Sequence, residues 1–279
     1  MPLNTSLLSL MTHWVTERES IRKKREAGFK RPWTIDPILQ QFKFCNVRRE
    51  DDRVTKWFAH NWREPKNWHK PQFVGAIMLG RTINWPDTLE EIGFPDVWSK
   101  EHLYSVLEAR KARGVKIYTG AYMVTQYGSS DPKNTLVSNN ADEYFRKKVP
   151  LDETSLENSW EILQTYPSMG PFMAAQVVAD LKFTNVLREA EDWSSWASLG
   201  PGSTRGLNRL YDRSLNYGLS QEQGLEEMRE VAEELGLHNL LDNLQDVQNC
   251  LCEFDKYVRV YNGEGTPRSR YDGYGPGKG

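Results

Sequence analysis

The sequence has few cysteines and no long hydrophobic stretch, and both shortages exclude classes of protein. Its three cysteines, Cys45, Cys250 and Cys252, are an odd number and too few for a disulfide framework or a four-ligand zinc site. No apolar run is long enough to cross a bilayer, and the first ten residues lack the basic flank and cleavage site of a signal peptide. We therefore expect reduced thiols, no structural metal, and a soluble cytoplasmic protein without membrane contact.

An excess of charge of one sign is also missing. The formal net charge of the 279 residues is −2, so the chain is not a generally basic nucleic-acid-binding protein, and any contact with DNA must be local. Two stretches are locally basic, namely residues 18–31 and the tail around Arg259, Arg268 and Arg270. Each fits a solvated surface as well as it fits a surface that contacts phosphates.

Aromatic residues and helix signals, by contrast, are abundant. Charged residues make up 27% of the chain, but ten Trp, twelve Tyr and ten Phe indicate a packed fold. We predict helices over residues 12–27, 103–113, 155–165 and 220–235, and one that opens at Thr34 with Pro37 in its first turn. Ser220 and Gln223 form a capping box for the helix over 220–235, and Gly236 ends it. The predicted fold class is mainly α.

Other segments are predicted from turn residues and from the scarcity of strand signals. Residues 115–119 are the best strand candidate, and loops are expected at 62–71, at 127–140 and from 263 onward. We divide the chain into an N-terminal helical part (1–150), a part that carries the motifs (151–262) and a flexible tail (263–279). The first two parts would form one integrated catalytic domain.

Residues 163–178 predict a helix, a tight turn and a second helix. Gly170 closes a Pro-x-x-Gly turn, where a glycine tolerates a positive φ and lets another backbone approach. The second helix would begin with unsatisfied N–H groups and a positive dipole end, which suit a phosphate. Ser168, Met169, Gly170 and Phe172 are therefore candidates for DNA contact, although an ordinary αα-hairpin fits the same pattern.

A glycine-rich loop precedes another predicted helix, over residues 204–215. Ser203 would be its N-cap and Arg205 would lie in its first turn. The backbone N–H groups of Gly200, Gly202 and Ser203 could cradle a phosphate, and Arg205 could add a charged contact. A loop that only caps the helix is the alternative.

The stretch 163–178 resembles the hairpin of the helix-hairpin-helix DNA glycosylases, which implies a two-lobed helical fold of that type. In that family a catalytic aspartate follows the hairpin at a characteristic distance, and Asp192 stands at that distance from Gly170. Phe172 occupies the place of the lysine that lyase members use, so lyase chemistry is not implied. A second alignment, based on residues 208–210, would put Gly200 at the aspartate position, and the sequence leaves this choice open.

Several stretches across the chain are similar to phage glutamyl- or putrescinyl-thymine pyrophosphorylases, also called amino acid:DNA transferases, and to the helical domain of 5-hydroxymethyluracil DNA kinases. These stretches are residues 44–53, 120–123, 200–207 and 246–259. The resemblance implies that, in a phage-infected bacterium, an amino acid or polyamine displaces pyrophosphate from an activated 5-hydroxymethyluracil base in DNA. The sequence has no P-loop motif, so the chain would act after a DNA-base kinase.

For this reaction the predicted catalytic residues are Asp192, Arg205 and Asp255, which would handle the proton of the amine and the charge of the leaving group. The predicted ligands of the pyrophosphate are Gly200, Gly202, Ser203, Arg48, Arg49, Arg53 and Lys256. No cofactor and no metal are predicted. A salt-bridged surface is the alternative for the three arginines at 48–53, and helical spacing would pair Asp255 with Arg259.

The target base would have to leave the stack, and Tyr122, Trp193 and Trp196 are candidates to stack on it. Core packing is the alternative role for these aromatic residues. Two other functions stay open at this point. One is a monofunctional glycosylase for a modified uracil or thymine that uses Asp192, and the other is a non-catalytic DNA-binding partner of a base kinase.

Overall fold

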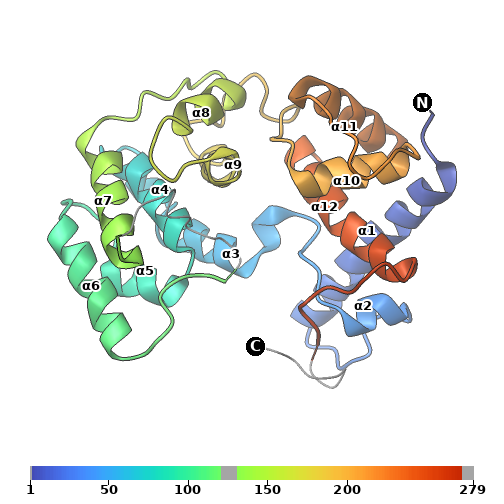
Figure 1. Cartoon of the computed structure of the whole chain (residues 1–279), viewed down its shortest axis with the longest axis horizontal. Helices are drawn as coiled ribbons and strands as arrows, with labels where there is room; N and C mark the ends of the chain where they lie inside the picture. The colour runs from blue at the N-terminus through green and yellow to red at the C-terminus, as the bar shows by residue number, and fades with distance from the viewer. Residues whose placement is uncertain (1, 121–130, 272–279) are drawn as a thin grey trace. The chain divides into compact units, whose positions relative to one another are not determined.

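The computed structural model describes residues 2–120 and 131–271, and these residues fold almost entirely into helices (Figure 1). They form twelve α-helices and two short 3-10 helices, with no β-strand in the described ranges beyond an isolated bridge between Phe42 and Arg270. The prediction of a mainly α fold is therefore confirmed. Within the same ranges no helix is both long enough and apolar enough to cross a membrane.

The chain divides into two compact units, each of which is described by itself. The first unit comprises Met1–Asp52 and Ser194–Gly279, and the second comprises Arg53–Trp193. The domain boundary that we predict near residue 150 lies inside the second unit. The predicted division into domains therefore stays a prediction.

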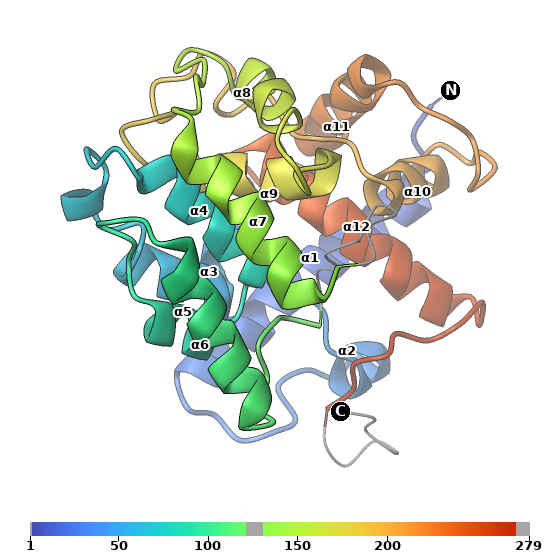
Figure 2. The same cartoon turned by 60° about the vertical axis from the view of Figure 1, so that its left-hand side comes forward.

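The first unit is built around two long helices. Its elements are α1 (Thr5–Glu26), α2 (Pro37–Gln41), the 3-10 helix η1 (Arg49–Asp51), α10 (Pro201–Leu210), α11 (Gln221–Leu235) and α12 (Leu244–Tyr261). Helix α10 packs most extensively against α12, and both views of the ribbon show them crossing closely (Figures 1 and 2). The core between these helices contains Leu207, Leu251 and Phe254, each fully buried.

The close approach of α10 to α12 depends on glycine. A Cβ on Gly206 would collide with the backbone carbonyl of Leu251, and a Cβ on Gly202 would collide with the side chain of Cys252. Backbone atoms cannot rotate away as a side chain can, so Gly206 is the position where any larger residue forces the two helices apart.

The second unit surrounds one buried helix. Its elements are α3 (Arg53–His60), η2 (Pro65–Asn67), α4 (Phe73–Ile83), α5 (Pro86–Ile92), α6 (Lys100–Ala112), α7 (Lys133–Arg146), α8 (Leu156–Leu163) and α9 (Pro171–Leu181). Helix α4 is buried along nearly its whole length, and α5, α7 and α9 pack around it (Figure 1). Helix α8 packs on α9, as the predicted hairpin requires.

Most of the predicted helices are confirmed, with shifted ends. Ser220 and Gln223 form the capping box of α11, and Gly236 ends it in the left-handed conformation. Pro37 occupies the first position of α2, and Ser155 caps α8. Helix α1 begins earlier than predicted because the Asn4 side chain accepts the N–H of Leu7.

Two segments predicted as strand or loop are wrong. Residues 115–119 form no strand; the carbonyls of Lys116 and Ile117 accept hydrogen bonds from the side chains of Arg110 and Thr88 instead. The described part of the loop expected at 127–140 becomes helical from Lys133, because that helix buries its apolar face in the unit. The loop expected at 62–71 is confirmed, and it contains the short 3-10 helix η2.

The helix expected over 204–215 is also wrong in its bounds. Helix α10 begins at Pro201 with Gly200 as its N-cap, and it ends at Leu210. Ser203 is therefore not the N-cap. It lies in the first turn, and its hydroxyl accepts the N–H of Gly200 at 3.0 Å.

Candidate functional site

The predicted hairpin is present in the second unit, with a turn that differs from the one expected. Gly170 is the N-cap of α9 and has φ −63°, whereas Ser168 adopts the positive φ of 59°. The Ser168 hydroxyl accepts a hydrogen bond from the Asn140 amide at 2.7 Å, and the Tyr144 hydroxyl donates to the Pro167 carbonyl at 2.6 Å. The turn is thus held by α7, and the proposed use of a positive φ at Gly170 is wrong.

The four residues predicted to contact DNA differ in their exposure. The Met169 side chain is fully buried, so it cannot touch a ligand on the surface. Phe172, in the first turn of α9, is 55% exposed. For Ser168, Gly170 and Phe172, contact with DNA stays a prediction.

Asp192 holds the beginning of α8. Its carboxylate accepts hydrogen bonds from the N–H groups of Leu156 and Glu157 at 2.7 and 3.0 Å, and from the Ser155 hydroxyl at 3.2 Å. These N–H groups belong to the first turn of the helix and have no partner within it. The spacing argument did not anticipate this structural contact, and a catalytic role for Asp192 stays a prediction.

The aromatic residues proposed to stack on a base have other neighbours. Trp196 is only 4% exposed and is part of the core of the first unit. The indole N–H of Trp193 donates to the Lys182 carbonyl at 2.7 Å, and the Lys182 ammonium lies 4.0 Å from the centre of the Trp193 ring. Trp196 is therefore too buried to stack on a base at the surface. Tyr122 lies outside the described residues.

The Gly-Pro-Gly-Ser loop is used for packing in the first unit. Ser203 is fully buried, and its hydroxyl exchanges hydrogen bonds with the backbone of Gly200. Gly202 faces Cys252 on α12. Burial also raises the pKa values of the Cys250 and Cys252 thiols, which suits their role as packing residues. The Gly200 N–H of the predicted phosphate cradle is already bonded to Ser203, and the cradle as a whole stays a prediction.

A buried carboxylate joins α10 to α12. Asp255 has no exposed surface and accepts hydrogen bonds from Arg205 Nε at 3.0 Å and Arg209 Nε at 2.8 Å. Arg209 in turn pairs with Glu264 at 2.6 Å. The predicted pair between Asp255 and Arg259 is wrong, because α10 supplies both cations. Asp255 cannot reach a substrate, whereas the Arg205 side chain is 39% exposed.

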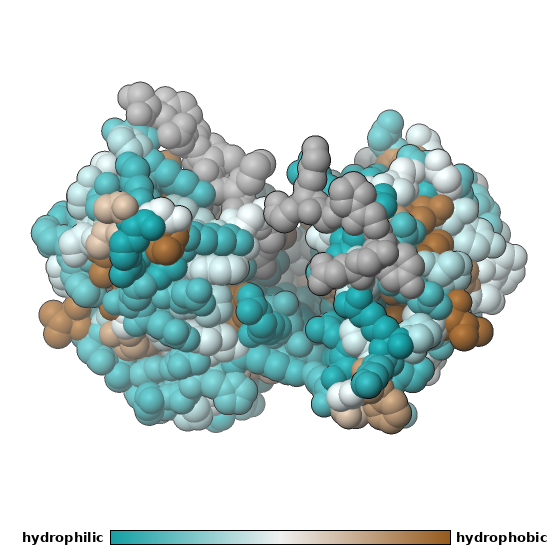
Figure 3. Space-filling model, turned by 90° about the horizontal axis from the view of Figure 1, so that it is seen from below, coloured by the Kyte–Doolittle hydropathy of each residue, from teal (hydrophilic) through white to brown (hydrophobic). Residues whose placement is uncertain are grey.

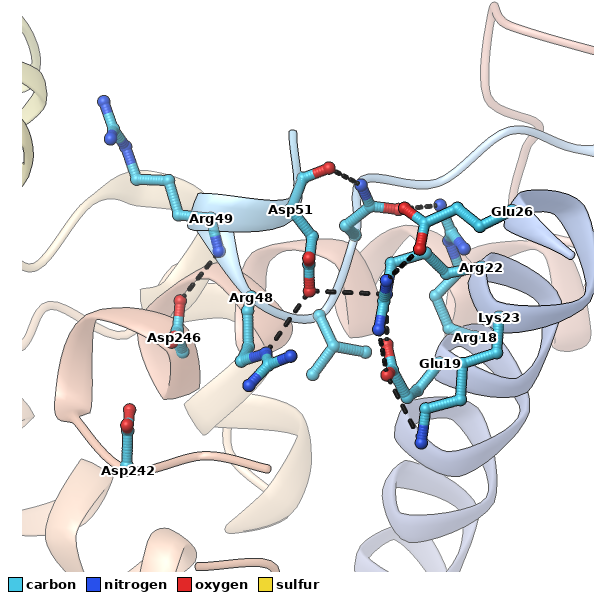
Figure 4. A network of polar contacts seen from close by, with 12 residues as sticks. Arg18, Glu19, Arg22, Lys23, Glu26, Arg48, Arg49, Asp51, Asp242 and Asp246 are labelled. Carbon is cyan, nitrogen blue, oxygen red and sulfur yellow. Dashed lines mark hydrogen bonds and ion pairs between the residues drawn. The ribbon is translucent and has the colours of Figure 1, made fainter. Parts of the chain in front are cut away.

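The arginines near residue 50 belong to an ion-pair network that ties η1 to α1 (Figure 4). Arg22 pairs with Glu19 and Glu26 at 2.5 Å and with Asp51 at 3.3 Å, and Arg48 also pairs with Asp51 at 3.3 Å. The interpretation as a salt-bridged surface therefore accounts for Arg48.

Other predicted phosphate ligands also have protein contacts. The backbone N–H of Arg49 donates to Asp246 on α12 at 2.9 Å, and the Lys256 ammonium pairs with Glu253. Arg53 begins α3 in the second unit, so it does not belong to the same unit as the other ligands. The structure thus does not assemble the predicted pyrophosphate ligands within one unit.

The second unit contains a buried charge cluster that sequence reasoning missed. Arg81, only 1% exposed, donates from Nη2 to Asp180 at 2.7 Å, and Arg63 Nη1 donates to the same carboxylate at 3.3 Å. Nη1 of Arg81 also donates to Asn84 at 3.0 Å. The available signal was a lone Asp180 in the apolar helix α9, because such a residue needs a cationic partner when buried.

The comparisons with known proteins define the family. The family model described as "5-hmdU DNA kinase, helical domain" matches residues 5–266, so the chain belongs to this family. The chain is also similar to a protein of Bacillus phage SP10 named "5-hmdU DNA kinase", with 27% identity over 88% of this chain. That alignment covers 44% of the phage protein, so the chain spans less than half the length of this relative. No solved structure matches the chain.

These findings overturn the predicted reaction. Both the family and the SP10 relative carry the name of a kinase, which transfers a phosphoryl group and does not replace pyrophosphate by an amine. The prediction of a pyrophosphate-displacing amino acid or polyamine transferase is therefore wrong. The expected links to phage, to 5-hydroxymethyluracil and to DNA modification are supported by the same two matches.

Proposed function

We propose that the chain acts in the phosphorylation of 5-hydroxymethyldeoxyuridine in DNA, in a phage-infected bacterium, and that its helices bind the DNA. The observation that carries this proposal is the match of the helical-domain family model to residues 5–266. The SP10 relative, named for the same substrate and reaction, supports it.

We assign the binding of the nucleotide to a separate kinase part. Phosphoryl transfer needs a site that cradles the phosphates of ATP, commonly a P-loop with the motif G-x-x-x-x-G-K-[ST]. This motif does not occur in the 279 residues of the chain. The chain would then supply DNA recognition, and the kinase part would supply the phosphoryl donor.

Within the second unit, we propose that the hairpin between α8 and α9 contacts the DNA backbone, as its resemblance to the helix-hairpin-helix glycosylases suggests. The first turn of α9 offers N–H groups that its own helix does not use, and the adjacent Phe172 is exposed. Phe172→Ala should weaken DNA binding, whereas Tyr104→Ala, which removes another exposed ring of this unit, should not.

The decisive experiment measures binding and phosphate transfer separately. Fluorescence anisotropy would compare the chain on oligonucleotides that contain 5-hydroxymethyluracil or thymine at one position. We expect binding of both and preference for the hydroxymethylated base. A chimaera in which this chain replaces the matching segment of the SP10 relative should transfer labelled phosphate from ATP to the hydroxymethylated oligonucleotide. Absence of DNA binding would refute the proposal, and transfer by the chain alone would place the kinase centre within it.

A further inference from the structure

The two basic stretches of the sequence meet on one surface of the first unit. The Lys43 N–H donates to the Ser269 carbonyl, and the Tyr271 N–H donates to the Gln41 carbonyl, both at 3.0 Å. The described end of the chain therefore runs beside residues 41–43, next to α2 in both ribbon views (Figures 1 and 2). The cations that lie over aromatic rings here are Arg25, Arg31, Lys43 and Arg270.

Two aromatic rings lie among these cations. Trp33 and Tyr271 are in edge contact, with ring centroids 5.8 Å apart. The Arg31 guanidinium lies 4.9 Å from the Trp33 ring and 4.4 Å from the Tyr271 ring. Arg25 lies 5.6 Å from the Trp33 ring, and the Lys43 ammonium lies 5.6 Å from the Tyr271 ring. We call these five residues the Trp33 surface.

A pocket of about 300 Å³ opens beside Trp33. Ile21, Trp33 and Leu39 give it apolar walls, and Arg31, Thr34 and Gln40 add polar groups. Its size is at the lower end of the range for small-molecule sites, which suits a planar group such as a single base. The described residues on the face seen in Figure 3 are mostly hydrophilic.

The charges near the pocket favour an anionic ligand. Three carboxylates in the described segment 17–36 have partners within the protein: Glu17 accepts from the Thr34 hydroxyl, Glu26 pairs with Arg22, and Asp36 caps α2 and accepts from Tyr257. The side chains of Arg25, Arg31 and Lys43 are exposed. Cations around an aromatic wall are the arrangement that binds phosphates and an unpaired base together.

From these observations we infer that the Trp33 surface binds a single strand of DNA, with one base in the pocket and the flanking phosphates on Arg25, Arg31 and Lys43. A duplex would not fit the same way, because its bases are stacked and cannot enter a pocket. This inference rests on the proposed function, since it identifies the surface that holds a strand of the DNA to be modified.

The test uses a labelled single-stranded dT12 oligonucleotide, which contains no hydroxymethyluracil. Arg25→Glu and Lys43→Glu change exposed residues and should each weaken binding about tenfold or more at low salt. Each should also flatten the dependence of log Kd on log salt by about 0.7 for every phosphate that the variant no longer neutralises. Lys148→Glu makes the same charge change on an exposed residue of the second unit and should leave the affinity unchanged.

The pocket is tested by a pair of substitutions at Trp33. Trp33→Leu removes the ring and should weaken binding about tenfold, the scale of one base stacked on an aromatic ring, whereas Trp33→Phe should retain most of the affinity. Because Trp33 is partly buried, circular dichroism must show that each variant is folded; if Trp33→Leu does not fold, the exposed Arg25 and Lys43 variants decide alone.

Wild-type affinity in both charge-reversal variants would overturn the inference. Equal competition by thymidine monophosphate would also overturn it, because the surface would then bind a mononucleotide and not a strand. Loss of dT12 binding in these variants, combined with failure of the chimaera to phosphorylate DNA, would sustain the Trp33 surface and refute the proposed kinase function alone.

Discussion

Helices α9 and α10 begin with the same two residues, Gly-Pro, and yet their first turns face different surroundings. Gly170 and Gly200 are both extended N-caps, and Pro171 and Pro201 both take the first helical position. At α10 the next residue, Gly202, packs against Cys252 on α12, and the Ser203 hydroxyl satisfies the N-cap N–H. At α9 the following residue, Phe172, is exposed. A local motif thus starts a helix, but its neighbours decide whether that start is a packing contact or an accessible surface.

The largest effect should come from removing the carboxylate that anchors α10. Asp255→Ala leaves Arg209, 6% exposed, without one of its two partners, and should cost about 3–5 kcal/mol of unfolding free energy. Glu264→Ala removes the other, partly exposed partner of Arg209 and should cost at most about 1 kcal/mol. Urea denaturation of both variants measures the difference. Similar small decreases in both would show that α10 is not held by its buried ion pair.

The same contrast explains what could be predicted from the sequence. The capping box of Ser220 and Gln223 and the proline at the start of α2 depend on residues close in the chain, and both predictions are confirmed. The burial of Ser203 depends on α12, and the Arg81–Asp180 contact joins residues 99 positions apart. No local pattern specifies such contacts.

The functional predictions also differed in how much of the sequence supported them. Stretches spread over the chain supported the link to 5-hydroxymethyluracil, whereas the reaction was implied by the resemblance to the pyrophosphorylases, with the glycine-rich loop assigned to its leaving group. That loop has the composition of a phosphate cradle, but Gly202 and Gly206 serve the approach of α10 to α12. Composition alone cannot distinguish a backbone that approaches a phosphate from one that approaches another helix.

A smaller effect should distinguish the glycines within that motif. Gly206→Ala places a methyl group against the Leu251 carbonyl and should cost about 1–3 kcal/mol. Gly200→Ala is the matched control, because its Cβ would meet only the Gln248 side chain at 3.8 Å and its φ of −126° suits any residue. We expect a decrease of about 0.5 kcal/mol or less for Gly200→Ala in the same urea titration. Equal decreases would contradict the packing role of Gly206.

The smallest effect concerns the hairpin side of the comparison, where Asp192 supports α8 from outside the helix. Asp192→Ala removes the acceptor for two N–H groups and should cost about 1 kcal/mol, as removal of a helix cap does. Asp192→Asn retains one carbonyl oxygen and should recover part of that stability, because an amide can still accept one of the two N–H groups. Unchanged melting temperatures in both variants would show that the Asp192 carboxylate does not stabilise α8. The two hydrogen bonds from Leu156 and Glu157 would then contribute nothing measurable to stability, and the supporting role of Asp192 would be refuted.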